Sequence, residues 1–289
     1  MTTAVLEPRA GRRCHNPLNS LHAAHYFSAD LAEELAAIGV TSPRAVNFAV
    51  RSAALGPVGA GAVAAAFYNY KYELVAEHVP AVWRTAAPEQ VLAARLRVVD
   101  ATLRRLLGDE AVASDDMAEA ARLALRATEA CTRGGRPLYS AHADLPVPEE
   151  PHLALWHAAT LLREHRGDGH LAALMSAELD GLEALVTHTA TGRGMTPSWV
   201  FTTRGWTRQE WDAAAGRLRE RGLLDADGEL TERGGALRER TEAETDRLDR
   251  APYEHLGAAG VLRLTELATG FARAAMTAGA FPADLIGKR

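Results

Sequence analysis

The chain has 289 residues, of which 47% are hydrophobic and 24% are charged, and its formal net charge is −5. This composition is ordinary for a soluble globular protein with a sizeable core and room for two domains. The acidic balance excludes a global attraction to nucleic acid or to anionic lipid. Two cysteines, Cys14 and Cys131, are too few for a disulfide framework, and the start MTTAVLEPRAGRR lacks the apolar segment of a signal peptide. We therefore expect a cytoplasmic protein without a membrane partner.

The N-terminal half predicts a series of helices. Residues 1–16 are expected to form an irregular arm, because they are rich in polar and helix-breaking residues. Helical periodicity then marks the segments 20–38, 42–55, 58–70, 73–83, 88–107 and 115–131. We expect an N-terminal helical domain at 17–131. A linker is expected at 132–150, where two glycines and three prolines interrupt any regular pattern.

The second half, 151–289, is expected to form one C-terminal domain. Its first stretch, 151–188, predicts two helices joined by a tight break at Gly167-Asp168-Gly169. Further on, the capping box Thr207-Arg208-Gln209-Glu210 opens a helix. An Asp227-Gly228 turn then predicts a hairpin. Two last helices are expected at 232–250 and 258–278.

A weak internal repeat relates the two halves. The run GPVGAGAVAAAFYNYKYELVAEH (56–78) aligns with GDGHLAALMSAELDGLEALVTH (167–188). Both contain a glycine-bearing break, a helix of small residues and a terminal LV–H. If the repeat reflects duplication, the chain is a fused pseudo-dimer and can act as a monomer; otherwise a homodimer is expected.

The run TRGWTRQEWDAAAGRLRERGLLDADGELTERGGALRERTEAETDRL (203–248) resembles the winged-helix half of MarR-type regulators. The wider chain, with GPVGAGAVAAAFYN and LREHRGDGH, is similar to an actinobacterial group of MarR-like helix-turn-helix proteins of undefined role. The resemblance implies a mainly α fold of two helical lobes. The C-terminal lobe would be a degenerate MarR-like winged helix with a short β-wing.

The charges of this segment depart from those of a DNA-binding winged helix. Residues 207–231 hold four arginines and six acids, a net of −2. A winged helix needs cations on the recognition helix and the wing to neutralise phosphates. Here Glu210, Trp211 and Asp212 occupy the start of the helix, where base edges are normally contacted. We interpret the segment as a winged helix that has lost DNA binding; the alternative is weak binding with cations supplied by another segment, such as Arg9, Arg12 and Arg13.

Ionisable side chains gather around the expected break at 167–169. A histidine titrates near neutral pH, and a neighbouring aspartate can fix its tautomer, so this set suits acid–base chemistry. The catalytic candidates are His165 or His170 as the acid–base group, Asp168 as its orienter, and Glu164. The same residues can instead bind a divalent metal or have structural roles only. We expect no metal site.

Polar and aromatic side chains elsewhere suit a pocket for a flat, polar small molecule. The candidates for substrate contacts are Arg51, Tyr68, Asn69, His25, Trp156, His157 and Glu178. The alternative is that the aromatic residues belong to the core and that Arg51 forms an ordinary ion pair.

The sequence lacks G-x-G-x-x-G, P-loop, G-x-S-x-G and H-E-x-x-H motifs. We therefore expect no cofactor, although a haem or another group held by one histidine stays open. The first hypothesis is a small-molecule-binding protein that has lost DNA binding, acting as a cofactor-independent enzyme of specialised metabolism through His/Asp acid–base chemistry. One alternative is a ligand-responsive MarR-type transcriptional regulator. The other is a metabolite-binding protein without catalysis.

Overall fold

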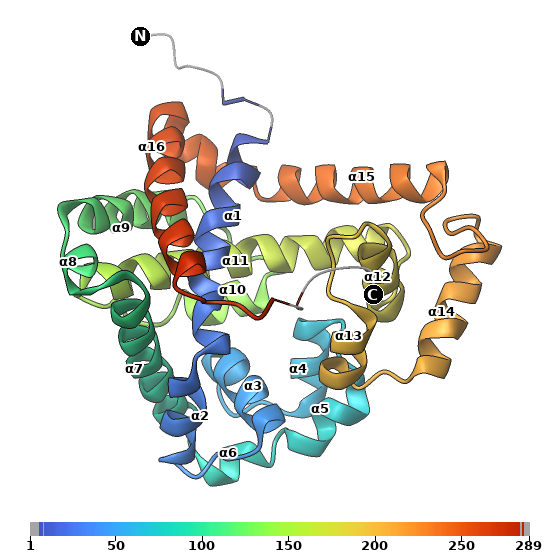
Figure 1. Cartoon of the computed structure of the whole chain (residues 1–289), viewed down its shortest axis with the longest axis horizontal. Helices are drawn as coiled ribbons and strands as arrows, with labels where there is room; N and C mark the ends of the chain where they lie inside the picture. Colours follow the sequence, from blue (N-terminus) through green and yellow to red (C-terminus); the bar gives the residue numbers. More distant parts are fainter. Residues whose placement is uncertain (1–5, 8, 284, 286–289) are drawn as a thin grey trace. The chain divides into compact units, whose positions relative to one another are not determined.

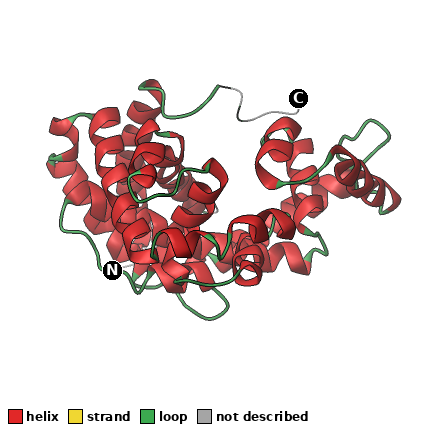
Figure 2. Ribbon diagram, turned by 90° about the horizontal axis from the view of Figure 1, so that it is seen from below, coloured by secondary structure: helices red, strands yellow, loops and turns green. Residues whose placement is uncertain are grey.

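The computed structural model of the chain describes residues 6–7, 9–283 and 285 (Figure 1). All regular elements of these residues are helices, which Figure 2 shows joined by loops. The predicted mainly α fold class is therefore confirmed. The chain divides into two compact units, and each unit is assembled from separate stretches rather than from one contiguous half. Unit 1 comprises Met1–Pro57, Val82–Gly169 and Asp246–Phe281, and unit 2 comprises Val58–Ala81, His170–Thr245 and Pro282–Arg289.

Unit 1 is built on the long helices at both ends of the chain. Its elements are α1 (Ala10–Ala23), η1 (Ala24–Phe27), α2 (Ala29–Ala36), α3 (Pro43–Ser52), η2 (Ala53–Leu55), α6 (Val82–Thr85), α7 (Pro88–Leu107), α8 (Asp109–Val112), α9 (Asp115–Thr128), α10 (Pro137–His142), most of α11 (Pro151–Ser176) and α16 (Arg250–Thr277). Helix α1 packs along α16, which also contacts α9 (Figure 1). Leu18, Leu103, Met117, Leu155 and Leu264 bring α1, α7, α9, α11 and α16 into one core. Burying each such side chain contributes roughly 1.5–3 kcal/mol.

Local signals in unit 1 begin and end several helices where the sequence predicts. Ser42 caps α3 by accepting a hydrogen bond from the amide of Ala45, and Pro43 stands at the first turn. Helix α7 covers the whole predicted segment 88–107 and ends at Gly108, whose φ of +85° favours glycine. These two helices are therefore confirmed.

Other predicted boundaries in unit 1 are wrong. The expected arm at 1–16 becomes helical at Ala10, although residues 1–5 and 8 lie outside the described part. The single helix expected at 20–38 is replaced by the end of α1, by η1 and by α2, which Ser28 caps. The linker expected at 132–150 contains α10, whose residues Leu138 and Tyr139 are buried.

The central stretch forms one long helix, α11, so the predicted break at Gly167-Asp168-Gly169 is wrong. Gly169 instead makes room for a guanidinium, because a Cβ at this position would lie 2.8 Å from Nη1 of Arg136. Nη1 of Arg136 donates to the carbonyl of His165, and Nη2 donates to that of Leu248 at 2.7 Å. Glycine in a helix interior costs about 1 kcal/mol relative to alanine. The two hydrogen bonds of the buried arginine offset this cost and keep the helix continuous.

Unit 2 is built around a second core. Its elements are α4 (Ala60–Phe67), α5 (Tyr72–His78), the end of α11, α12 (Gly181–Ala190), α13 (Pro197–Arg204), α14 (Arg208–Glu220) and most of α15 (Glu232–Leu248). Leu182, Leu185, Val200, Leu218 and Leu223 join α12, α13 and α14 with the segment that follows them. The capping box predicted at Thr207 is present, with its side chain accepting from the amide of Glu210 at 3.2 Å.

The predicted β-wing is not formed in the described part of unit 2. Between α14 and α15 the chain turns back with a single isolated bridge between Leu224 and Leu230. The side chain of Asp225 accepts hydrogen bonds from the amides of Asp227 and Glu229, at 3.0 and 2.9 Å. The carboxylate of Asp225 thus occupies backbone amides that a longer pairing of two strands would need for its own hydrogen bonds. The last two predicted helices also differ in extent, since α16 begins before 258 and bends at Gly257.

The two stretches of the suggested internal repeat both contribute to unit 2. Tyr68, directly after α4, and Glu178, two residues after α11, have positive φ angles of 61° and 54°. Gly181 opens α12 so close to α4 that a Cβ would meet the carbonyl oxygen of Tyr68. Among the described residues no single helix is long and apolar enough to cross a membrane, and only the bent pair 43–55 and 60–67 meets that criterion jointly.

Candidate functional site

Imidazole rings from several helices gather in the interior of unit 1. We call this group the buried histidine cluster; its members are His22, His25, Arg95, His142, Trp156 and His157, from α1, η1, α7, α10 and α11. The ring of His22 stacks on Trp156 with centroids 5.2 Å apart and an interplanar angle of 11°. His25 meets both rings edge-on at 5.3 Å. The guanidinium of Arg95 lies over the same tryptophan at 5.2 Å. The cluster therefore places the indole of Trp156 between an imidazole, a guanidinium and the edge of a second imidazole.

The histidines of the cluster are neutral at pH 7. Burial lowers the pKa of His25 to about 3 and of His142 and His157 to about 4, and it lowers the pKa of His22 well below the usual value. The charge of the nearby Arg95 contributes to each of these shifts. Neutral imidazoles offer one donor and one acceptor each, so the cluster can recognise a polar group without adding charge.

Hydrogen bonds to backbone carbonyls assign two of the tautomers. Nδ1 of His142 donates to the carbonyl of Leu138 at 2.8 Å, which leaves Nε2 to accept from Arg95 at 3.2 Å. Nδ1 of His25 donates to the carbonyl of His22 at 2.7 Å. Within the described residues, Nε2 of His25 and Nδ1 of His22 are buried without a hydrogen-bond partner. Buried polar atoms are usually paired, so these two nitrogen atoms are available to a bound molecule or to water.

Arg95 is the cation of this cluster and is only 5% exposed. Its Nη1 donates to the carbonyl of Val50 at 2.8 Å and to His142. Among the residues that the structure describes, Nε and Nη2 of Arg95 make no hydrogen bond, and no carboxylate oxygen lies within 4.0 Å of its guanidinium. Burial accordingly lowers the pKa of Arg95, and the charges of Tyr26 and Glu164 only partly oppose this effect. The arginine is thus buried with its charge incompletely balanced.

Glu164 interacts with several arginines. It is buried and pairs with the neighbouring Arg163, whose Nε also donates to the side chain of Asn19. Arg163 and Arg51 hold the pKa of Glu164 below its usual value against the opposing effect of burial. The ion pair of Glu164 is therefore with Arg163, and its charge acts on Arg51 and Arg95 only from a greater distance.

A His–Asp pair lies further along α11. Nδ1 of His165 bonds Oδ1 of Asp249 at 2.8 Å, and both side chains are 2% exposed. Burial raises the pKa of Asp249, while the bond to His165 opposes this shift. The carboxylate bonded to His165 is therefore Asp249 and not Asp168, whose role as the orienter of a catalytic histidine stays a prediction. The sequence contains a signal for the position of Asp249 at a helix start, because an aspartate three residues before Pro252 is typical of an N-cap. Helix α16 does begin directly after Asp249.

Asp168 orders a different element. Its Oδ2 accepts from the amide of Tyr139 at 2.9 Å and so supports the first turn of α10. The pKa of Asp168 is raised to about 6, chiefly by burial and also by the negative charge of Glu164, while the hydrogen bond from the amide of Tyr139 opposes the shift. Oδ1 of Asp168 is buried without a partner among the described residues.

The remaining predicted site residues belong to unit 2. The hydroxyl of Tyr68 donates to the carbonyl of Leu179 at 2.5 Å, and the carbonyl of Asn69 accepts from Nε1 of Trp206 at 2.9 Å. Nδ1 of His170 lies 2.9 Å from the hydroxyl of Thr245. The last residue, Glu178, is exposed. The predicted site residues are thus divided between the units. Arg51, His25, Trp156 and His157 lie with Glu164 in unit 1. Unit 2 contains the other four, which are Tyr68, Asn69, His170 and Glu178.

Three helices of unit 2 have the arrangement of a helix-turn-helix. Helix α13 is joined to α14 by the short turn 205–207, in which Gly205 has a φ of +82°. Helix α12 packs against α14. In the winged-helix segment that the sequence resembles, α14 stands where the recognition helix is expected.

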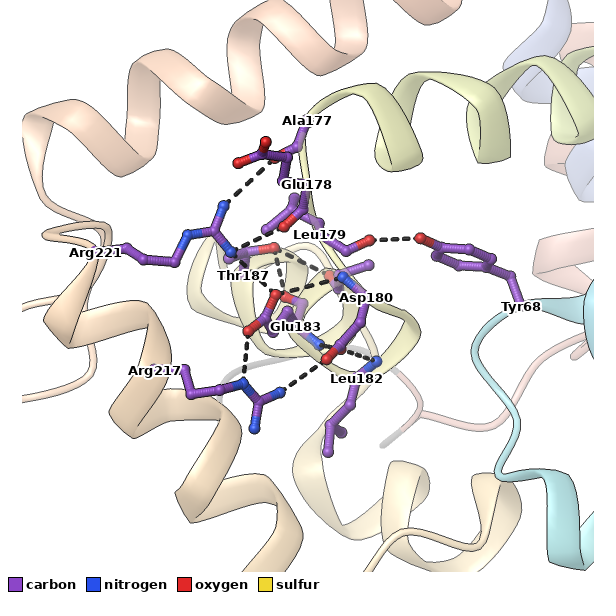
Figure 3. Close-up of polar contacts among 11 residues, drawn as sticks. Tyr68, Ala177, Glu178, Leu179, Asp180, Leu182, Glu183, Thr187, Arg217 and Arg221 are labelled. Carbon is purple, nitrogen blue, oxygen red and sulfur yellow. Dashed lines mark hydrogen bonds and ion pairs between the residues drawn. The ribbon is translucent and has the colours of Figure 1, made fainter.

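Internal contacts occupy several cations of this segment (Figure 3). Arg217 of α14 bonds Asp180 at 2.8 Å and Glu183 at 2.9 Å, both at the start of α12. Arg221, just after α14, bonds Glu183 at 3.1 Å and the carbonyl of Glu178 at 2.9 Å. These arginines serve to hold α14 against α12.

The sequence matches a helix-turn-helix family over residues 11–282. The chain belongs to this family. No curated protein and no solved structure matches it. The family match covers both units of this helix-turn-helix family member, so the buried histidine cluster lies within the matched region. Within the described residues, no group of three or more His, Cys, Asp or Glu side chains is arranged to hold a metal ion.

Proposed function

We propose that this helix-turn-helix family member binds a small molecule in the buried histidine cluster of unit 1, on a MarR-like scaffold that no longer binds DNA. The observation that carries the proposal is the pair of unpartnered ring nitrogens, Nδ1 of His22 and Nε2 of His25, beside the indole of Trp156. Leaving a buried polar atom unpaired costs about 1–3 kcal/mol. A site with aromatic rings and a few convergent polar atoms is typical of small-molecule pockets.

The loss of DNA binding is supported by the contacts of α14. Its first turn includes Glu210, whose carboxylate bonds Lys71 at 2.5 Å, and an acid there would repel a phosphate. Arg217 and Arg221 are paired with acids of α12 or near it. An arginine used in this way is less able to neutralise DNA, since it would have to give up an existing partner.

Catalysis has weaker support than binding. His165 is buried and is bonded to Asp249, so a substrate would need to reach it through the surrounding side chains. The acid–base roles of His165, His170, Asp168 and Glu164 stay predictions. They require that His165→Ala or His170→Ala reduce turnover of a bound ligand.

A fragment screen by ligand-observed NMR tests the binding site. We expect flat, polar fragments to bind wild-type protein and to lose affinity in His25→Phe, which removes Nε2 but keeps an aromatic ring. The matched control is His255→Phe, since His255 is exposed on α16 and bonds Glu129 at the surface. The absence of any bound fragment, or equal binding by His25→Phe, would contradict the proposal.

A ligand-responsive regulator is the second candidate, and the family match together with the geometry of α13 and α14 favours it. Arg208, Gln209 and Arg219 are exposed on α14 and could contact DNA. A gel-shift titration at low salt against DNA from the protein's own gene neighbourhood separates the candidates, because screening is weakest there. Retardation that depends on sequence, relative to a random duplex, would favour the regulator; its absence is our expectation.

A further inference from the structure

We infer that the ligand of the buried histidine cluster carries a carboxylate, which pairs with the guanidinium of Arg95. This inference rests on the proposed function and specifies the class of molecule that the site takes.

The geometry of Arg95 leaves donors for such a group. Nη1 is occupied by the carbonyl of Val50 and by His142, whereas Nε and Nη2 make no hydrogen bond among the described residues. Nε and Nη2 of a guanidinium lie on one edge and can donate in parallel to the two oxygens of a carboxylate. The unoccupied edge of Arg95 therefore matches a carboxylate in both geometry and charge.

The neighbouring groups do not already supply the anion. His22, His25 and His142 are neutral, and Glu164 is bonded to Arg163. A buried cation without a paired anion is unfavourable by several kcal/mol, so a structure that keeps one gains when an anion enters. A neutral ligand of the same shape would leave this charge unbalanced.

The aromatic rings of the cluster indicate the body of the ligand. The rings of His22 and Trp156 are parallel, and Arg95 covers the same indole. A planar acid can place its ring beside these surfaces while its carboxylate reaches the guanidinium. A flat organic monocarboxylate thus satisfies both features of the cluster.

Matched acids and amides test the inference, with benzoate against benzamide and indole-3-acetate against indole-3-acetamide as probes. Dissociation constants are measured by calorimetry for wild type, Arg95→Met and Arg95→Lys. Because hydrogen bonds between charged groups are the stronger ones, wild type should bind each acid at least about tenfold more tightly than its amide. Arg95→Met should abolish this preference, and Arg95→Lys, which keeps the charge but not the planar edge, should retain part of it.

The matched control is Arg97→Met, which removes an arginine from the exposed side of the same helix, where Arg97 pairs with Glu34. It should keep the full preference for acids, and circular dichroism checks that all variants are folded. If amides bind as tightly as acids, or if Arg95→Met and Arg95→Lys both keep the preference, the inference is overturned while the proposed function stands. If neither acids nor amides nor any screened fragment binds, the proposed function fails and the inference fails with it.

Discussion

Replacement of Glu183 by glutamine should destabilise unit 2, because this one carboxylate holds both arginines next to α12 (Figure 3). Its side chain is 6% exposed; Oε1 accepts from Arg217 at 2.9 Å and Oε2 accepts from Arg221 at 3.1 Å. A glutamine amide keeps one acceptor and turns its NH₂ toward a guanidinium, so at least one charge-assisted bond becomes a contact between two donors. Such a bond contributes about 1.5–3 kcal/mol. Arg217 is 48% exposed and can be rehydrated, so we expect a net loss near the lower limit, about 2 kcal/mol.

The measurement is urea unfolding followed by tryptophan fluorescence, since Trp199, Trp206 and Trp211 all lie in unit 2. Glu220→Gln is the matched control, because this exposed acid of α14 loses the same charge and should change stability by less than about 0.5 kcal/mol. If Glu183→Gln unfolds within that margin of wild type, the two arginines do not secure α14. Their ion pairs with α12 would then not withhold Arg217 and Arg221 from DNA.

Two further predictions concern pH. Asp168 has a pKa of about 6 in the folded state against 3.8, so its contribution to stability is present below about pH 4 and is lost as the pH rises through 6. Between pH 5 and 7.5, Asp168→Asn should therefore gain about 1.4 kcal/mol of unfolding free energy relative to wild type in chemical denaturation. The surface variant Asp144→Asn should gain nothing. The buried histidines act in the opposite direction: His15 and His25 have a pKa of about 3 and His142 and His157 of about 4, below the unfolded value of 6.5. Their contribution is complete above about pH 6.5 and is lost on acidification at about 1.4 kcal/mol per pH unit each. Helical circular dichroism should therefore collapse between pH 6 and 4, and a signal unchanged at pH 4 would show that these histidines are not buried in neutral form.

Elements that depend on local signals could be predicted from the sequence. The helix over 88–107 has its own periodicity, a proline at the start and a glycine at the end. The box at Thr207 is likewise complete within four residues. The continuity of α11 depends instead on Arg136, which reaches Gly169 from a distant part of the chain. No local pattern around the glycines contains that contact, so a break was the reasonable but wrong prediction.

The candidate site likewise has one feature that depends on long-range packing and one that the local sequence shows. Asp249 is 84 residues from His165, and their pairing follows from packing that periodicity cannot show. Arg95, however, has a visible signal in the sequence. It stands four residues after Val91 and four before Val99, within the apolar stripe of an amphipathic helix. A charged residue at such a position is buried when the helix packs, so the periodicity of 88–107 is sufficient to mark Arg95 as a buried cation.

The pairing of the first long helix with the last has a consequence for synthesis. Arg12 bonds Asp246 across 234 residues, and α1 packs along α16. At about 5–20 residues per second, the ribosome needs roughly 12–47 s between these two positions. During that interval the apolar side chains of Cys14, Leu18 and Leu21 lack the partners that finally bury them. The nascent N-terminus is therefore a segment for which chaperones that hold exposed apolar helices would compete, and unit 1 closes only when almost the whole chain has been made.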